Sequence, residues 1–162
     1  MNINKILIGI DDSNFAEHAA AYGFSLARTL NAAVGLVYVV EPVTPMPAGT
    51  DTTLGLTSMG MPVDGIVNPE IADMRDNAGS TLIQQAIDRY GEGLQVSHFT
   101  DYGTTADGIL HCSQEYGADL IVIGTHSRTG LDRFIMGSVA EKVIRSSTVP
   151  VLVVPMKTDK EA

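Results

Sequence analysis

The chain has very little cysteine, no long apolar run and few cationic residues. Its single cysteine, Cys112, excludes an internal disulfide and fits a reducing compartment. No apolar stretch is long enough to cross a bilayer. The N-terminus, Met1 to Lys5, lacks the cationic region and apolar core of a signal peptide. We therefore expect a cytoplasmic protein with no membrane partner.

The shortage of cations argues against a nucleic-acid partner. Ten Lys and Arg residues stand against 19 Asp and Glu, which gives a formal net charge of −9. A surface of that sign repels the phosphate backbone of DNA or RNA. It does not exclude one small nucleotide, because backbone N–H groups hold phosphates without any net positive charge.

The length and the apolar content indicate one globular domain. With 162 residues, 44% of them hydrophobic, the chain can form a complete core. We expect a single domain over residues 1–157, with a polar tail at 158–162. A segment rich in Pro, Gly, Thr and Met, residues 41–65, interrupts the regular pattern. It is either a surface insertion or a cover for a ligand site.

Apolar runs and helical spacing alternate along the chain. The expected strands are 5–10, 33–40, 94–99, 119–123 and 149–155, and the expected helices are 16–30, 69–90, 104–116 and 138–146. This alternation predicts a three-layer α/β/α sandwich with a parallel sheet. The third strand, which alternates, and the fifth, which carries two prolines, suit edge positions. Ligands in such folds bind beyond the carboxyl ends of the strands, where Asp11 and Gly124 are expected to be neighbours.

A strand, a loop and a helix start around Gly124 indicate an anion site. The unbroken apolar run Leu120–Ile123 suits a strand buried on both faces, and it is expected to end at Gly124. Further on, Gly137 precedes Ser138, which with Glu141 three residues later forms the pattern of a capping box. The free N–H groups and the positive dipole of a helix N-terminus favour phosphate. The segment therefore predicts a nucleotide site.

Three segments together resemble the universal stress protein family. They are Ile8–Ser13, the glycine-punctuated stretch 124–141, and Val149–Val154. The resemblance covers the whole chain in the same order of elements, apart from residues 41–65. It implies a Rossmann-like fold of the adenine nucleotide alpha hydrolase type, with strand order 3-2-1-4-5. It also implies homodimers joined through strand 149–155.

The resemblance extends to the glycine pattern of the family's ATP-binding members. That pattern is Gly, two residues, Gly, nine residues, and then Gly-Ser or Gly-Thr. Gly124 fits the first position and Gly137-Ser138 fits the last, while Ser127 stands where the second glycine is expected. Glycine allows close backbone approach, whereas serine adds a hydroxyl that could reach a phosphate.

The resemblance implies ATP, or AMP or ADP, as the ligand and assigns a role to individual residues. Asp11 would lie at the ribose and at a metal ion such as Mg²⁺, and the backbone of Val39 would contact the adenine edge. Arg128 is the nearest loop cation that could meet a γ-phosphate. The residues expected around the phosphates are Gly124, Ser127, Gly137, Ser138 and Val139.

The same residues have plainer interpretations. Ser138, Asp11 or Asp12 could act only as helix caps. His126 has no evident carboxylate partner, and Cys112 is expected to be a small buried residue within a helix. Without a recognisable base, nucleophile or metal cluster, we expect at most slow ATP hydrolysis.

Two other functions compete with a nucleotide-binding stress or signalling protein. The first is a non-nucleotide oligomerisation module of the same fold. The second is a receiver-like phosphoacceptor domain, since Asp11–Asp12, Asp101, Thr125 and Lys157 follow successive strands in the order of an acidic Mg²⁺ pocket. The long loop between Gly124 and Gly137 argues against the receiver.

Overall fold

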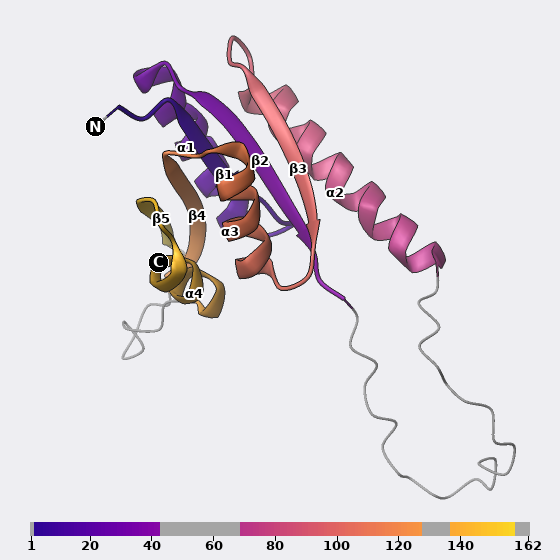
Figure 1. Cartoon of the computed structure of the whole chain (residues 1–162). Coiled ribbons are helices and arrows are strands. Elements are labelled where there is room, and N and C mark those ends of the chain that lie inside the picture. Colours follow the sequence, from indigo (N-terminus) through magenta and orange to yellow (C-terminus); the bar gives the residue numbers. More distant parts are fainter. Residues whose placement is uncertain (1, 43–68, 128–136, 158–162) are drawn as a thin grey trace, which may run out of the picture.

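One parallel sheet lies between two layers of helices (Figure 1). The computed structural model describes residues 2–42, 69–127 and 137–157, so most of segment 41–65, Arg128 and the tail 158–162 lie outside the described residues. The strands are β1 (Lys5–Gly9), β2 (Ala33–Val40), β3 (Val96–Tyr102), β4 (Leu120–Ser127) and β5 (Val151–Lys157). The helices are α1 (Asn14–Leu30), α2 (Pro69–Tyr90), α3 (Thr105–Tyr116) and α4 (Ser138–Ser146).

The strand order is β3-β2-β1-β4-β5, with every neighbouring pair parallel, which confirms the predicted sheet. β1 is central: Ile8 pairs with Leu36 of β2 on one side and with Val122 of β4 on the other. Strands buried on both faces need unbroken apolar sequence, and β1 and the first half of β4 have it. β3 and β5 lie at the edges, as their sequences predicted.

The hydrophobic core is divided by the sheet into two clusters. One lies under α1 and α2 and includes Phe24, which is fully buried; the other lies under α3 and α4 and includes Val143. Each buried side chain of this size stabilises the fold by about 1.5–3 kcal/mol. No helix in the described part of the chain combines the length and the apolar character that a membrane span requires.

β4 is longer than its sequence suggested. It continues through Gly124 to Ser127, because β5 runs past Pro155 and pairs with this extension, for example Gly124 with Val154. The prediction that the strand ends at Gly124 was wrong. Pro155 has no N–H to donate, and a position on an edge strand tolerates this. β3 and β5 also begin and end a few residues later in the sequence than predicted.

The predicted capping box at α4 is also absent. Gly137 is the N-cap, none of the described side chains caps the helix, and Ser138 is its first residue. The Glu141 carboxylate instead accepts a hydrogen bond from Arg145, one turn later. Within the described part of the chain, no side chain pairs with the N–H groups of the first turn, so a ligand could accept hydrogen bonds from them.

α1 is capped by Ser13 rather than by an aspartate. The Ser13 hydroxyl accepts from the N–H of Ala16 at 3.2 Å. Asp11, two residues before Ser13, also stabilises this turn, because its Oδ1 accepts from the N–H of Ser13 at 2.7 Å. The loop after β1 is thus held in place by two short-range hydrogen bonds.

Candidate functional site

A cleft of about 240 Å³ opens at the end of β1, beside residues 123–125 of β4. Between these strands the chain order reverses, which is where parallel sheets of this type bind ligands. The strand ends, the loop after β1 and the first turns of α3 and α4 form its walls. The described lining residues are Gly9, Ile10, Asp11, Ser13, Phe15, Ala16, Val37, Val39, Thr105, Ile109, Ile123, Gly124, Thr125, Gly137, Ser138, Val139 and Ala140.

Most of the predicted site residues are brought together here. Ser127 ends β4, beyond the described lining, and Arg128 lies outside the described residues. The predicted residues that line the cleft are Asp11, Val39, Gly124, Gly137, Ser138 and Val139.

Gly124 holds the first turn of α1 against β4. A Cβ built at this position would lie 2.4 Å from the carbonyl oxygen of Phe15 and 3.1 Å from the nitrogen of Ala16. No side chain fits in that space. The packing of helix on strand therefore requires glycine here, whether or not a ligand is bound.

Gly137 has no such close contact within the described residues. The only described atom within 4 Å of a Cβ built there is the Thr125 hydroxyl oxygen, at 4.0 Å. That hydroxyl is buried and has no hydrogen-bond partner among the described residues. Buried polar groups are normally paired, so an unpaired hydroxyl in a cleft wall fits a polar ligand.

Asp11 has one carboxylate oxygen at the cleft without a partner among the described residues. The residue is exposed and its Oδ1 is engaged with Ser13. A carboxylate in this position can accept hydrogen bonds from sugar hydroxyls or coordinate a hard cation. Asp12, its neighbour, does not line the cleft.

Glu41 and Thr105 join the end of β2 to the start of α3 at the rim. The Glu41 carboxylate accepts from the Thr105 N–H at 3.0 Å and also from the Thr105 hydroxyl. These hydrogen bonds hold the pKa of Glu41 below its usual value. Sequence reasoning missed Thr105, although the Thr104-Thr105 pair follows a strand at the same edge of the sheet.

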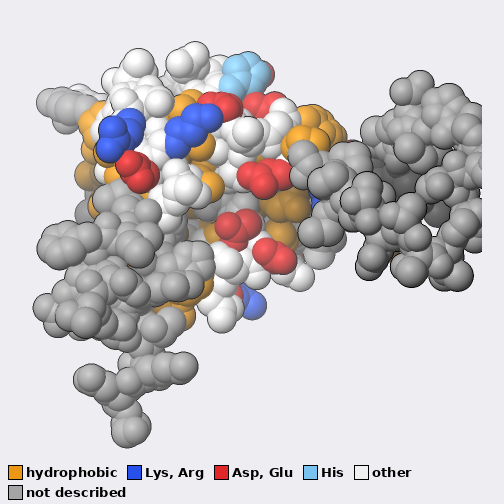
Figure 2. Space-filling model, turned by 90° about the horizontal axis from the view of Figure 1, so that it is seen from below, with side chains coloured by type: hydrophobic (Ala, Val, Ile, Leu, Met, Phe, Trp, Pro, Cys, Tyr) orange, Lys and Arg blue, Asp and Glu red, His pale blue; other side chains and the backbone are white. Residues whose placement is uncertain are grey.

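Asp11 is the one carboxylate among the described residues that line the cleft. Figure 2 views the molecule from the edge where the strands end and shows further Asp and Glu side chains on the described part of this face, together with Lys and Arg. Lys142 pairs with Asp107 at 2.7 Å, and this ion pair joins α4 to α3. None of the described lining residues is Lys or Arg, so the described groups that could meet an anion in this cleft are backbone N–H groups and hydroxyls.

A second cleft, of about 220 Å³, lies between α1 and α2. The ion pair of Glu17 with Arg89 lies at this cleft. The two clefts share Asp11 and its neighbours Ile10 and Ser13, but the second contains neither glycine of the predicted motif. The first cleft is therefore the candidate site.

The receiver-like arrangement is not formed. β2 separates β3 from β1, so Asp101 is not beside Asp11. Asp101 lies within the edge strand, paired in register with Val39, and its carboxylate contacts His111. An acceptor aspartate on a central strand is missing from this sheet.

The sequence as a whole matches one family model. The model of the universal stress protein family aligns with residues 2–155. The chain belongs to this family. Universal stress protein MJ0531 of Methanocaldococcus jannaschii is 32% identical over 152 residues, which are 93% of this chain and 81% of that protein.

Solved structures of universal stress proteins have the same fold. That of protein MJ0577 superposes with a TM-score of 0.73 at 22% identity, covering 98% of this chain and 100% of that one. A universal stress protein in complex with cAMP gives 0.64 at 21% identity, covering 95% and 98%. One from Archaeoglobus fulgidus in complex with dAMP gives 0.58 at 20% identity, covering 94% and 98%. At these identities the likeness concerns the fold.

Proposed function

We propose that this universal stress protein binds an adenine nucleotide, ATP or a close relative, in the cleft between β1 and β4. The observation that carries the proposal is the convergence of Asp11, Val39, Gly137 and Ser138, from four separate segments, on one cleft. Two universal stress proteins of the same fold have been solved in complex with cAMP and with dAMP, and these ligands support an adenine nucleotide as the ligand class.

The base, the ribose and the phosphates of the nucleotide would each contact different residues of the cleft. Val39, at the end of β2, faces the base, and Asp11 accepts hydrogen bonds from the ribose hydroxyls. The phosphates lie at the start of α4, where the N–H groups of Ser138 and Val139 and the helix dipole attract negative charge. The unpaired Thr125 hydroxyl supplies a further donor in the same wall.

A nucleotide in this cleft would bring a cation with it. The described lining residues include no Lys or Arg, so a metal ion, together with Arg128 of the loop after β4, would neutralise the phosphate charge. Mg²⁺ takes oxygen ligands, often one carboxylate together with phosphates and water. Asp11 is the described carboxylate in the cleft wall and would hold the ion.

The proposed role is stress response or signalling through a nucleotide-linked state of the protein, not rapid catalysis. Asp11 is the one ionisable side chain among the described lining residues, and a lone carboxylate makes a weak hydrolytic centre. A ligand held by α1, α3 and α4 together can instead shift a conformational or dimer equilibrium. The outer edge of β5, which has no partner strand within the described sheet, provides the surface for a homodimer.

Native mass spectrometry tests the proposal. Protein freed of nucleotide would be incubated separately with ATP, ADP, AMP and GTP at equal concentrations. We expect adenine nucleotide adducts of one per chain, and the same spectrum reports dimer mass. Absence of any adenine adduct from folded protein would support the oligomerisation module and refute nucleotide binding.

A further inference from the structure

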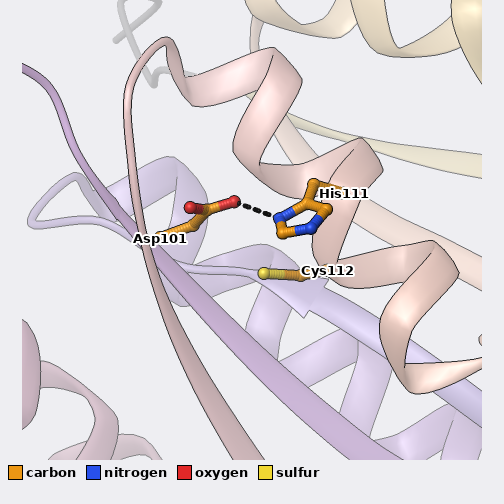
Figure 3. A group of neighbouring side chains, drawn as sticks. All are labelled: Asp101, His111 and Cys112. Atoms are coloured by element: carbon orange, nitrogen blue, oxygen red, sulfur yellow. Dashed lines mark hydrogen bonds and ion pairs between the residues drawn. The ribbon is translucent and has the colours of Figure 1, made fainter.

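Three side chains with different ligating atoms meet between β3 and α3 (Figure 3). His111 Nδ1 lies 2.8 Å from Asp101 Oδ2. Figure 3 shows the carboxylate and the ring facing each other, with the Cys112 sulfur directed from the helix toward the strand. One ligand atom from each residue lies within 4.8 Å of the other two. None of the three lines the nucleotide cleft.

We propose that Asp101, His111 and Cys112 bind a zinc-class divalent ion, separate from any ion that accompanies the nucleotide. The set contains one carboxylate oxygen, one imidazole nitrogen and one sulfur. Zn²⁺ accepts all three kinds of ligand, whereas Mg²⁺ and Ca²⁺ require oxygen. Three protein ligands leave a fourth tetrahedral position to water.

The spacing of the ligand atoms suits this ion. Zinc bonds of about 2.0 Å to nitrogen or oxygen and 2.3 Å to sulfur place tetrahedral ligands roughly 3.3–3.6 Å apart. The present separations, from 2.8 Å to at most 4.8 Å, bracket that range. Binding one ion would lengthen the Asp101–His111 separation and bring the Cys112 sulfur closer to both.

The surroundings orient the ligands and leave an entry path. The Tyr102 N–H donates to Asp101 Oδ1 at 2.8 Å, so Oδ2 remains available to an ion. Hydrogen bonds of this kind to a ligating carboxylate are a regular feature of metal sites. The His111 side chain is 67% exposed and that of Asp101 24%, whereas Cys112 is buried at 2%. An ion can thus enter from solvent at His111 and reach a sulfur fixed by the core.

The protonation state of the Cys112 thiol limits which metal ions can bind. Burial, together with the nearby negative charges of Asp101 and Glu115, raises the pKa of Cys112 to about 11. The proton must therefore leave to solvent as the metal–sulfur bond forms. Ions with high thiolate affinity displace it, and hard oxygen-seeking ions do not. Asp101 and the thiolate each contribute one negative charge, so together they neutralise the charge of a divalent ion.

Cobalt titration tests the site, because Co²⁺ substitutes for Zn²⁺ and reports thiolate ligation by a charge-transfer absorption. The reduced full chain, stripped of metal and nucleotide, should develop that absorption with one equivalent of Co²⁺. Zn²⁺ should abolish it and excess Mg²⁺ should leave it. Cys112→Ser should remove the absorption, and Asp101→Asn and His111→Gln should each weaken cobalt affinity about tenfold or more.

His98→Gln is the matched control, since His98 is an exposed histidine on the same strand as Asp101 and is not part of the cluster. Its titration should equal that of the wild type. His111→Gln changes an exposed side chain, so it reports on the site even where Cys112→Ser alters the core. Two results would overturn the proposal: no charge-transfer absorption in the reduced wild type, or a cobalt titration of His111→Gln that equals that of the wild type. Either result would mean that Asp101 and His111 form only a hydrogen-bonded pair next to a buried cysteine.

Discussion

Gly124 and Phe15 are in direct backbone contact, at a distance that leaves no room for any side chain on the glycine. A Cβ at Gly124 would lie 2.4 Å from the Phe15 carbonyl oxygen, and backbone cannot move aside as a flexible side chain can. The first glycine of the motif thus has a packing role that is independent of phosphate. This contact sets the position of α1 and, through the preceding loop, of Asp11.

Gly124→Ala is expected to destabilise the fold by roughly 1–3 kcal/mol, the range for overpacking a filled site. Denaturant unfolding measures this change. Gly137→Ala is the matched control, because a Cβ there meets no described atom closer than 4.0 Å. Its free energy of unfolding should lie within about 0.5 kcal/mol of the wild-type value. Equal stability of both variants would contradict the assigned contact.

Asp11→Ala should weaken ATP binding by roughly 1–3 kcal/mol, the cost of losing hydrogen bonds to a charged acceptor. Asp12→Ala provides the comparison, since Asp12 carries the same charge and lies next in sequence but does not line the cleft. Its binding should change little. A titration in which Asp12→Ala has the larger effect would reverse the assignment of the two residues.

The Glu41–Thr105 contact predicts a pH-dependent contribution to stability. The folded-state pKa of Glu41 is below its ordinary value of 4.5, so the carboxylate stabilises the fold above pH 4.5 and loses this effect as pH falls. Glu41→Gln should therefore cost on the order of 0.5–1 kcal/mol near neutrality, a figure that allows for solvent screening.

Urea unfolding of wild type and Glu41→Gln from pH 7 to pH 3 checks this. The gap between the two proteins should be constant down to about pH 5 and shrink below it, since the variant cannot ionise. A gap that widens on acidification would contradict the direction of the pKa shift.

The proposed dimer through β5 predicts the effect of Val153→Lys. Leu152 and Val153 are partly buried on an edge strand paired only with β4 in the described sheet, and a charge at such an edge opposes pairing. Ultracentrifugation should show monomer or aggregate. Ile144→Lys, which charges an apolar side chain 41% exposed on α4, should remain dimeric. An intact dimer in folded Val153→Lys, or a monomeric wild type, would exclude pairing through this strand.

The sheet was predictable because its signals are local and repeated. Continuous apolar runs and regular helical spacing identify each element, and the family resemblance supplied their order. The extension of β4 was not predictable from its own residues, because Gly124–Ser127 form strand only where β5 pairs with them. The capping box failed for a similar reason: Ser138 has the right spacing, but the chain turns into the helix one residue earlier, at Gly137.

The site was only partly predictable, because some of its residues come together only when separate helices and strands pack against one another. Asp11 and Gly137 belong to recognisable sequence motifs. Thr105 belongs to no such motif and lines the cleft only because α3 packs beside it. The Asp101–His111–Cys112 cluster joins a strand to the helix that follows it. Cys112 was expected to be a small buried residue, and the structure confirms that burial while adding two ligating neighbours.

Calorimetric titration of ATP with Mg²⁺ into nucleotide-free wild type and Gly137→Val tests the central claim most directly. The added isopropyl group would occupy the space at the start of α4, where the nearest described atom to a Cβ is 4.0 Å away, so the fold should survive while the phosphates lose their place. The account predicts saturable binding of one ATP per wild-type chain and none in folded Gly137→Val. Equal ATP affinity in the two proteins would place the nucleotide elsewhere and contradict the account.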